Sequence, residues 1–222
     1  MSDEKTVAFN PDAPISIISY VLTSAVAPLM ITLGPIIIGA YVEVLGLTEK
    51  QAVKIFSTEM AGFSFGGIIV FLLLSRVNWR HIVLGAFIFL ILGNFAALGV
   101  DTLQPLLIIR FLTGLGSGTL MAMTVVSIGM TKNPERIYGL WLASQYISAA
   151  IAITFLARLI PEYGLAAAFI IFAILGLSLV WVFLHFPERS EIKAGGSTIA
   201  GTRKALVLGV LGLLGIFVFY GG

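Results

Sequence analysis

Long apolar runs separated by short polar connections make up most of the chain. The runs are much longer than a strand of about 4–8 residues and show no sustained alternation of apolar and polar positions. A helix that spans a membrane needs roughly 20 apolar residues, and each run reaches that length. The pattern therefore predicts an all-α membrane protein. Its six expected helices cover Ile15–Leu45, Glu49–Leu74, Trp79–Val100, Leu103–Met130, Glu135–Leu159 and Tyr163–Leu184.

Polar segments divide the chain into four parts. Residues 1–14 form a cytoplasmic tail that lacks the basic start of a secretory signal, and residues 15–185 hold the six-helix bundle. Residues 186–203 contain proline, glycine and charges of both signs, as expected of a cytoplasmic linker. Residues 204–222 are apolar and predict a seventh transmembrane helix, which we expect to be truncated. This layout is typical of one half of a transporter built from repeated halves, so the expected partner is a C-terminal six-helix half or a second copy.

The composition excludes an ordinary water-soluble globule. Of the 222 residues, 59% are hydrophobic and 11% are charged, whereas soluble domains have about 45–50% apolar and about 25% charged residues. The lipid bilayer is therefore the expected surrounding. The net charge is only +2, and the basic residues lie between the apolar runs, so no nucleic-acid partner is expected. The chain has no cysteine, which excludes disulfides and thiolate metal sites.

Basic residues near the helix ends predict the orientation, because they are enriched on the cytoplasmic side of membranes. With a cytoplasmic N-terminus, nine basic residues lie inside and three lie outside. The inner set is Lys5, Arg76, Arg80, Lys132, Arg136, Arg189, Lys193, Arg203 and Lys204, and the outer set is Lys50, Lys54 and Arg158. We expect a multi-pass protein of the inner or plasma membrane with its N-terminus in the cytoplasm.

Two ionisable residues lie well inside expected helices, where each costs roughly 2.5–3.5 kcal/mol on insertion scales. Glu59 in the second helix and Arg110 in the fourth both lie roughly 10–15 Å below the outer surface. A carboxylate and a guanidinium at close range would exchange partners when a proton or an anionic substrate arrives. The pair is a candidate for coupling, and a static ion pair that fixes helix packing is the alternative. Glu43 is either a further carboxylate at the outer mouth or a solvated helix end.

Glycines in the second and fourth helices recur at helical spacing. Gly114 and Gly118 form a GxxxG pair, and Gly62 and Gly66 repeat that spacing in the second helix. Such pairs let neighbouring helices approach closely, so we expect these two helices to pack tightly, with Gly116 as a further packing residue. A nucleotide-binding loop is not expected, because the run lacks the third glycine of GxGxxG and follows no strand.

Pro28 and Pro35 interrupt the first expected helix. Such breaks free backbone carbonyls, which are tolerated where they line a cavity. The Thr32–Gly39 region is therefore a candidate wall of a substrate site, and an ordinary kink is the alternative. The remaining polar or aromatic candidates are Gln145 and Tyr146, in the fifth helix, and Tyr20, which is alternatively an interfacial anchor.

Motifs of enzymes are missing from the sequence. There is no Walker A pattern GxxxxGK[ST], so we expect no ATP hydrolysis by this chain. No HExxH motif, paired histidines or carboxylate cluster indicates a metal, and no Ser/His/Asp grouping would assemble in one aqueous pocket. We expect no enzyme activity, no cofactor and no metal.

Two short motifs carry more specific information. The run RFLTGLGSG begins at Arg110, and the basic loop SRVNWRH follows the second expected helix. Together with the six-helix layout, they resemble the major facilitator superfamily of secondary transporters. The first run matches the family's fourth-helix pattern RxxxGxGxG at every defined position. The loop is a weaker match to the family's pattern GxxxDRxGRR. There Arg76 and Arg80 fit, whereas Ser75, Asn78 and Phe71 depart from it.

The resemblance covers the whole chain as the N-terminal half of the family's usual twelve helices plus the start of the seventh. It implies a secondary active transporter that works by alternating access, with a small-molecule substrate, protons as the coupling ion and a coupling role for Arg110. It also implies a cytoplasmic gating loop at Arg76 and Arg80. The fifth helix lacks the GxxxGPxxGG stretch of the family's drug–proton antiporters. Drug efflux and a non-transporting membrane scaffold remain the alternatives.

Overall fold

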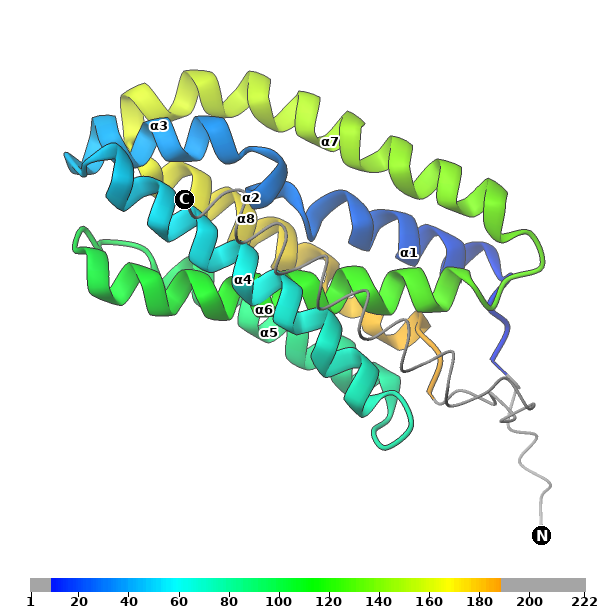
Figure 1. Ribbon diagram of the computed structural model, residues 1–222. Helices are drawn as coiled ribbons and strands as arrows, with labels where there is room; N and C mark the ends of the chain where they lie inside the picture. Colours follow the sequence, from blue (N-terminus) through cyan, green and yellow to red (C-terminus); the bar gives the residue numbers. More distant parts are fainter. Residues whose placement is uncertain (1–8, 189–222) are drawn as a thin grey trace, which may run out of the picture. The chain divides into compact units, whose positions relative to one another are not determined.

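The computed structural model describes residues 9–188, which form eight α-helices and a terminal 3₁₀ helix (Figure 1). The elements are α1 (Pro14–Val26), α2 (Leu29–Thr32), α3 (Gly34–Leu45), α4 (Glu49–Leu73), α5 (Trp79–Ala96), α6 (Leu103–Ile128), α7 (Pro134–Tyr163), α8 (Leu165–Leu179) and η1 (Val180–His185). Residues 9–188 contain no strand, so the all-α prediction is confirmed for this part. The seventh helix and nearly all of the linker predicted from the sequence lie outside the described residues.

The first predicted helix is not continuous but consists of α1, α2 and α3. The first break falls at Pro28, which has no N–H to continue the hydrogen bonds of α1 and instead becomes the N-cap of α2. The second falls at Leu33, and Pro35 then lies in the first turn of α3, where no backbone N–H is needed. A single helix over Ile15–Leu45 is therefore wrong, whereas the predicted interruption by the two prolines is confirmed.

Two other helix ends differ from the predictions because of glycine and proline. α5 ends at Ala96, four residues early, and Gly99 follows with a φ of 73°. α7 runs through Pro161 to Tyr163, and Gly164 ends it with a φ of 67°. Both glycines adopt left-handed backbone angles that a residue with a Cβ rarely accepts. The chain therefore turns at these glycines rather than where the apolar pattern ends.

The long helices alternate in direction, so that successive connections lie at opposite ends of the bundle (Figure 1). At one end the Lys132 N–H donates to Asp12 Oδ1 at 2.8 Å, and Arg80 pairs with Glu188. The opposite end brings together the end of α3, the α5–α6 connection and Gly164 around one pocket. This up-and-down order is what short connections between spanning helices require.

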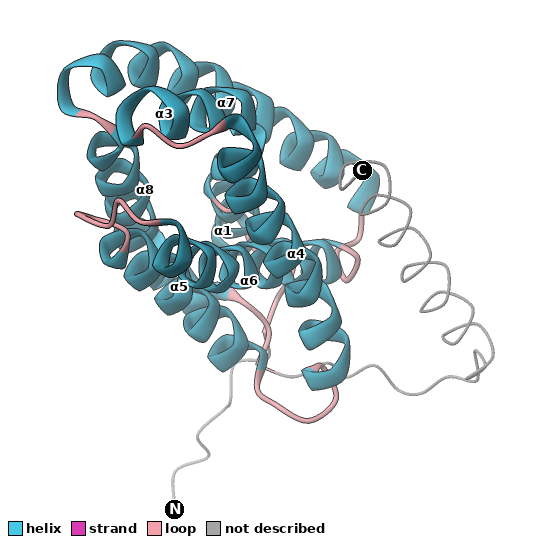
Figure 2. Cartoon of the chain, turned by 60° about the vertical axis from the view of Figure 1, so that its left-hand side comes forward, coloured by secondary structure: helices cyan, strands magenta, loops and turns pink. Residues whose placement is uncertain are grey.

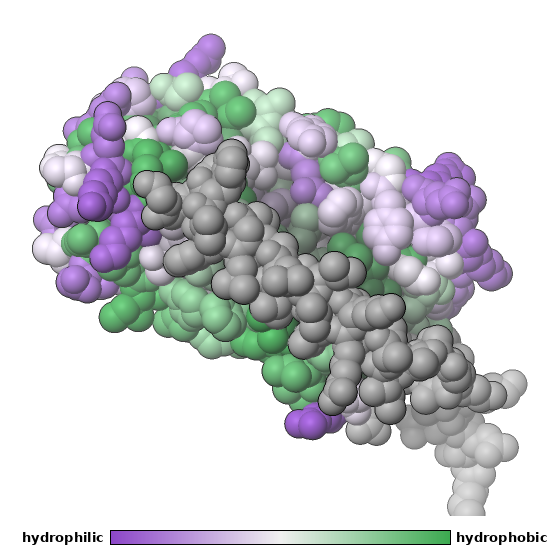
Figure 3. Space-filling model, in the orientation of Figure 1, coloured by the Kyte–Doolittle hydropathy of each residue, from purple (hydrophilic) through white to green (hydrophobic). Residues whose placement is uncertain are grey.

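Five helical segments of the described residues are long and apolar enough to cross a membrane. They are α4, α5, α6, α7 and the continuous α8–η1 segment. On the face in Figure 3, hydrophilic residues gather at the two ends of the bundle and hydrophobic residues lie between them. The chain is an integral, multi-pass membrane protein.

Glycines of α6 set the packing of the three helices α4, α5 and α6, which lie together on one side of the bundle (Figure 2). Cβ atoms at Gly114 and Gly118 would collide with backbone carbonyl oxygens of α4, whereas one at Gly116 would lie 2.6 Å from the Ala86 carbonyl oxygen of α5. Cβ atoms at Gly62 and Gly66 of α4 would likewise meet the backbone of α6. The tight packing predicted for the second and fourth helices is therefore confirmed, and alternate glycines of one run face two different neighbours.

Candidate functional site

Glu59 and Arg110 face each other across the α4–α6 contact. Arg110 Nη1 lies 3.7 Å from Glu59 Oε1, and the two side chains are 0% and 2% exposed, respectively. Gly114 lies one helical turn after Arg110, and a Cβ there would collide with the Glu59 carbonyl oxygen. The same close helix contact thus brings the two charges together, as the sequence predicted. A buried ion pair of this kind is stable only while both partners keep their charges.

Arg110 donates hydrogen bonds to α5 rather than to Glu59. Its Nη1 and Nη2 each lie 3.3 Å from Asn94 Oδ1, and Nη2 also donates to the Gly93 carbonyl oxygen at 3.1 Å. Asn94 is 2% exposed and was not among the sequence candidates. The signal was present, because Asn94 is the one amide side chain in an otherwise apolar stretch of α5.

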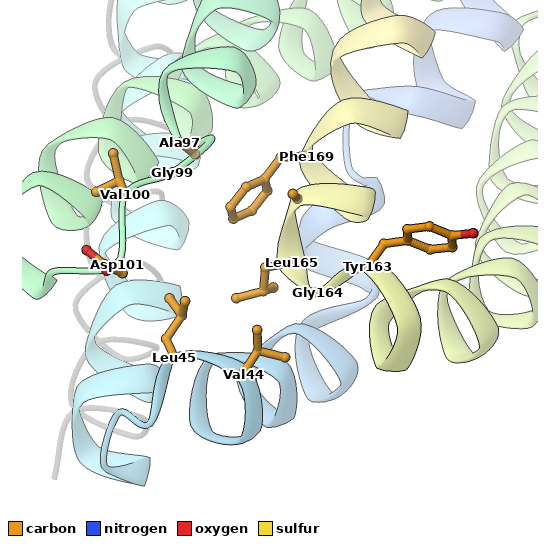
Figure 4. Close-up of a pocket in the computed structure, with 11 residues that line it drawn as sticks. Val44, Leu45, Ala97, Gly99, Val100, Asp101, Tyr163, Gly164, Leu165 and Phe169 are labelled. Atoms are coloured by element: carbon orange, nitrogen blue, oxygen red, sulfur yellow. The ribbon is translucent and has the colours of Figure 1, made fainter.

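Phe169 of α8 covers the guanidinium from another side. The Arg110 Cζ atom lies 4.7 Å from the centroid of the Phe169 ring, within the range of a cation–π contact. Phe169 also lines a pocket of ≈ 220 Å³ between the end of α3, the α5–α6 connection and the start of α8. In Figure 4 its ring points into this pocket, and Asp101 lies at the opposite side. One aromatic ring therefore contacts both the pocket and the buried arginine.

Three polar atoms of this region have no hydrogen-bond partner among the described residues: Tyr41 Oη, Glu59 Oε1 and Arg110 Nε. Tyr41 is fully buried on α3, near enough for the charges of Glu59 and Arg110 to act on its hydroxyl group. Buried polar atoms are normally hydrogen-bonded. Tyr41 Oη and Arg110 Nε therefore have free capacity to donate to a small polar molecule, and Glu59 Oε1 is free to accept a hydrogen bond or a proton. The arrangement suits a change of protonation at the Glu59 carboxylate.

The other substrate candidates do not join this site. Glu43 and Thr32 are exposed, and the Thr32 hydroxyl donates to the Pro28 carbonyl oxygen at 3.0 Å. Tyr146 is 67% exposed on α7, and Gln145 Nε2 reaches only the carbonyl oxygen of its own helix at Trp141. Among the described residues, none of these four forms a hydrogen bond or an ion pair with Glu59 or Arg110.

The two arginines of the predicted gating loop have different surroundings. Arg76 is exposed, whereas Arg80 Nη1 lies 2.6 Å from Glu188 Oε1 and Arg80 Nε donates to the Phe186 carbonyl oxygen at 3.0 Å. The Trp79 N–H also donates to the Glu188 carbonyl oxygen at 2.9 Å. The start of α5 therefore holds the segment that follows η1.

Serine hydroxyls link α1 to α7, a contact that sequence reasoning missed. Ser24 Oγ and Ser144 Oγ are 2.8 Å apart, and Ser148 Oγ donates to the Ala25 carbonyl oxygen at 2.6 Å. Ala25 lies just before the Pro28 break, so a hydroxyl of α7 binds a carbonyl near the end of α1. We refer to Ser24, Ser144 and Ser148 as the serine seam.

Tyr20 is not an interfacial anchor. Its side chain is fully buried, and its ring packs edge-on against Phe186 with ring centroids 5.2 Å apart. The amphipathic ring suggested a place at the lipid headgroups, but the polar face of α1 turns inward in this fold. Within residues 9–188, no three His, Asp or Glu side chains lie close enough together to hold a metal ion.

Comparisons with known proteins agree with this architecture. No family model matches the chain. The chain is 29% identical over 155 residues to the 4-hydroxybenzoate transporter PcaK of Pseudomonas putida, a match that covers 66% of this chain and 34% of PcaK. Among solved structures, a mutant of the peptide transporter POT bound to alafosfalin matches with a TM-score of 0.66 and 20% identity, over 94% of this chain and 47% of that chain. A POT family transporter bound to a thioalcohol-conjugated peptide matches with a TM-score of 0.62 and 15% identity, over 92% and 46% of the two chains.

The chain shares the fold of about half of each of these POT chains, as expected from its resemblance to the N-terminal half of a major facilitator transporter. The resemblance that was based on Arg110 and the glycines after it is therefore confirmed. The chain spans about a third of the length of PcaK and less than half of the POT chains. These relatives are transporters, which points away from an enzyme.

Proposed function

We propose that this chain forms the N-terminal half of a secondary active transporter that moves a small organic solute across the inner or plasma membrane, with protons as the coupling ion. The observation that carries the proposal is the buried pair of Glu59 and Arg110. A bundle that served only as a scaffold would gain little from two buried charges, because such a pair is often no more stabilising than apolar residues of similar volume.

Proton coupling follows from the chemistry of the pair. A carboxylate beside a guanidinium keeps its charge, and a proton on the carboxylate leaves the arginine charge uncompensated. Glu59 Oε1 has no hydrogen-bond donor among the described residues, so it is free to accept a proton. Protonation would therefore change the electrostatic state of a site that lies on three packed helices, and alternating access would use that change to favour one conformation.

The substrates of the relatives support a small organic solute as the substrate, but no narrower class. PcaK is a 4-hydroxybenzoate transporter, and the POT chains are peptide transporters, so their substrates are organic molecules with ionised groups. Within the proposed transporter, the exposed Thr32 at the end of α2 and the face of α7 that carries Gln145 and Tyr146 would turn toward the other half of the protein. The gating role of Arg76 and Arg80 and the cytoplasmic N-terminus belong to the same proposal.

The first experiment is the intact mass of the native product in its own membranes. This chain has a mass of 23.7 kDa, and we expect a native product of roughly twice that mass, since transporters of this kind consist of two repeated halves. A native mass equal to that of this chain would favour a half-bundle that works as a dimer or as a scaffold.

The second experiment measures uptake of radiolabelled 4-hydroxybenzoate by the native-length protein in vesicles with an imposed proton gradient. We expect Arg110→Ala to abolish uptake driven by the gradient while the variant still inserts, and Glu59→Gln to remove the pH dependence of uptake. Arg158→Ala, which alters an exposed basic residue at the end of α7, is the control. Near-normal gradient-driven uptake by Arg110→Ala would contradict the coupling role, and an unchanged pH profile would leave Glu59 a packing residue.

A further inference from the structure

The hydrogen bonds of Arg110 are distributed unevenly between its two neighbouring helices. Within residues 9–188, the guanidinium makes three hydrogen bonds and all go to α5, two of them to Asn94 Oδ1 and one to the Gly93 carbonyl oxygen. From α4 it receives only the charge of Glu59, at 3.7 Å and without a hydrogen bond. The position of the arginine is therefore fixed by α5, whereas Glu59 supplies a countercharge.

Asn94 is itself held in one orientation. Its Nδ2 group donates to the Leu90 carbonyl oxygen at 2.8 Å, which leaves Oδ1 as the atom that faces Arg110. Gly93, which precedes Asn94, has no room for a side chain, because a Cβ there would collide with the Thr113 hydroxyl of α6. α5 thus approaches α6 closely enough for both the Gly93 carbonyl and the Asn94 amide to reach the guanidinium.

We infer that Asn94 is a positioning residue that keeps Arg110 in place when Glu59 is neutral. With Asn94 present, protonation of Glu59 removes a countercharge but none of the three hydrogen bonds. Without it, a neutral Glu59 leaves the buried guanidinium with the Gly93 carbonyl as its single hydrogen-bond acceptor. The inference concerns the geometry of this site, and it deepens the proposed proton coupling by naming the residue that allows Glu59 to titrate without releasing the arginine.

The groups that face Glu59 determine which other side chains of this site can change their charge with pH. The titratable groups are Arg110 from α6 and Tyr41 from α3. The segment α2, which also packs against α4, carries no titratable residue. Near Arg110, α5 supplies Asn94 and α8 supplies Phe169, neither of which titrates. Glu59 is thus the carboxyl group of this cluster.

The test is thermal unfolding of the purified 222-residue chain in lipid nanodiscs at about pH 9 and about pH 5, which bracket the titration of a buried carboxylate. We expect the Tm of Asn94→Leu to fall by roughly 5 °C more at the acid pH than at the alkaline pH, relative to the unsubstituted chain. The Asn94→Leu/Glu59→Gln double variant should show the lower Tm at both pH values, because glutamine imitates the neutral carboxyl group.

Two further variants keep the test decisive. Thr124→Val removes a buried hydroxyl that bonds the Leu120 carbonyl oxygen of its own helix, away from Arg110, and it should lower Tm equally at both pH values. If Asn94→Leu does not fold, Asn94→Ser removes the same amide with a smaller change and should shift Tm in the same direction.

The outcomes separate this inference from the proposed function. A strictly additive effect of Asn94→Leu and Glu59→Gln would overturn the positioning role of Asn94, because the two residues would then not support the same guanidinium. A double variant that is far less stable than the sum of its parts, together with no pH dependence in Asn94→Leu, would support the positioning role and contradict proton uptake by Glu59.

Discussion

The two longest helices of the described chain, α6 and α7, differ sharply in how they are held. In an apolar 18-residue stretch of α6, 56% of the residues are buried, whereas only 11% are buried in the corresponding stretch of α7. α6 packs against α4 and α5 through glycines that bring backbone to backbone, whereas α7 contacts α1 through serine hydroxyls and leaves a long apolar face uncovered. The large exposed apolar side chains of α7 are Leu140, Leu142, Tyr146, Ile147, Ile151, Ile153, Phe155 and Tyr163.

We refer to the tightly packed helices α4, α5 and α6 as the rigid scaffold. α7 lies outside it and keeps a free face. The charges of Glu59 and Arg110 lie in the α4–α5–α6 part, where backbone contacts leave little room for adjustment. The exposed face of α7 is available for lipid or, under the proposed function, for a second half of the transporter. In the proposed transporter, a coupling pair would need fixed geometry and a helix that meets a second half would need a free face, so the two proposed roles fall on different helices.

The largest effect should come from filling the glycine contact of α6. Gly118→Leu places a side chain against the Phe63 carbonyl oxygen of α4, and we expect it to lower the free energy of unfolding by more than about 3 kcal/mol. Gly67→Leu is the matched control, since nothing lies within 4 Å of a Cβ at that position of α4. Thermal unfolding in detergent measures both. Equal stability of the two variants would contradict the view that α4 and α6 form a rigid scaffold.

A smaller effect should come from the serine seam. Ser148→Ala removes the hydroxyl that donates to the Ala25 carbonyl oxygen, and we expect a loss of about 1 kcal/mol in the free energy of unfolding. Thr154→Ala is the control, because that exposed hydroxyl bonds only the Ala150 carbonyl oxygen of its own helix. A loss as large as that of Gly118→Leu would remove the contrast between the two sides of the bundle.

The smallest effect should come from the polar end of α5. Arg80→Ala breaks the contact with Glu188, whose side chain is 62% exposed, so we expect a loss of less than about 1 kcal/mol that shrinks further at high salt. Arg76→Ala, in the same loop and exposed, should have no measurable effect. Unfolding temperatures at low and high salt make the comparison. A large, salt-independent loss would extend the rigid scaffold to the end of the helix.

The sequence predicted the helices well, because an apolar run of spanning length has one stable form in lipid. It also located the breaks in the first helix, since Pro28 and Pro35 cannot donate the hydrogen bonds that a continuous helix needs. The ends of α5 and α7 were misplaced because they depend on the backbone angles of Gly99 and Gly164. Nothing in the hydrophobic pattern distinguishes these glycines from the many that lie within helices.

The candidate site was predictable in part. The cost of a buried charge drew attention to Glu59 and Arg110, and the glycine spacing placed their helices side by side. Asn94 was missed although it is the one amide side chain in that stretch of α5, because a neutral amide costs less to bury than a charge. Phe169 was missed because an aromatic ring is ordinary in an apolar helix. The serine seam was missed for a related reason, since a serine in a helix commonly bonds its own backbone and gives no sign of a partner on another helix.

The glycine contacts of α6 also affect which second-site substitutions can restore a variant that is destabilised at one of these glycines. The atoms that a new Cβ would meet at Gly114 and Gly118 are main-chain carbonyl oxygens of Glu59 and Phe63, which every amino acid carries. No shortening of a side chain on α4 can make room for them. A suppressor screen that starts from a substitution at either glycine should therefore return reversion to glycine far more often than a compensating change on the facing helix.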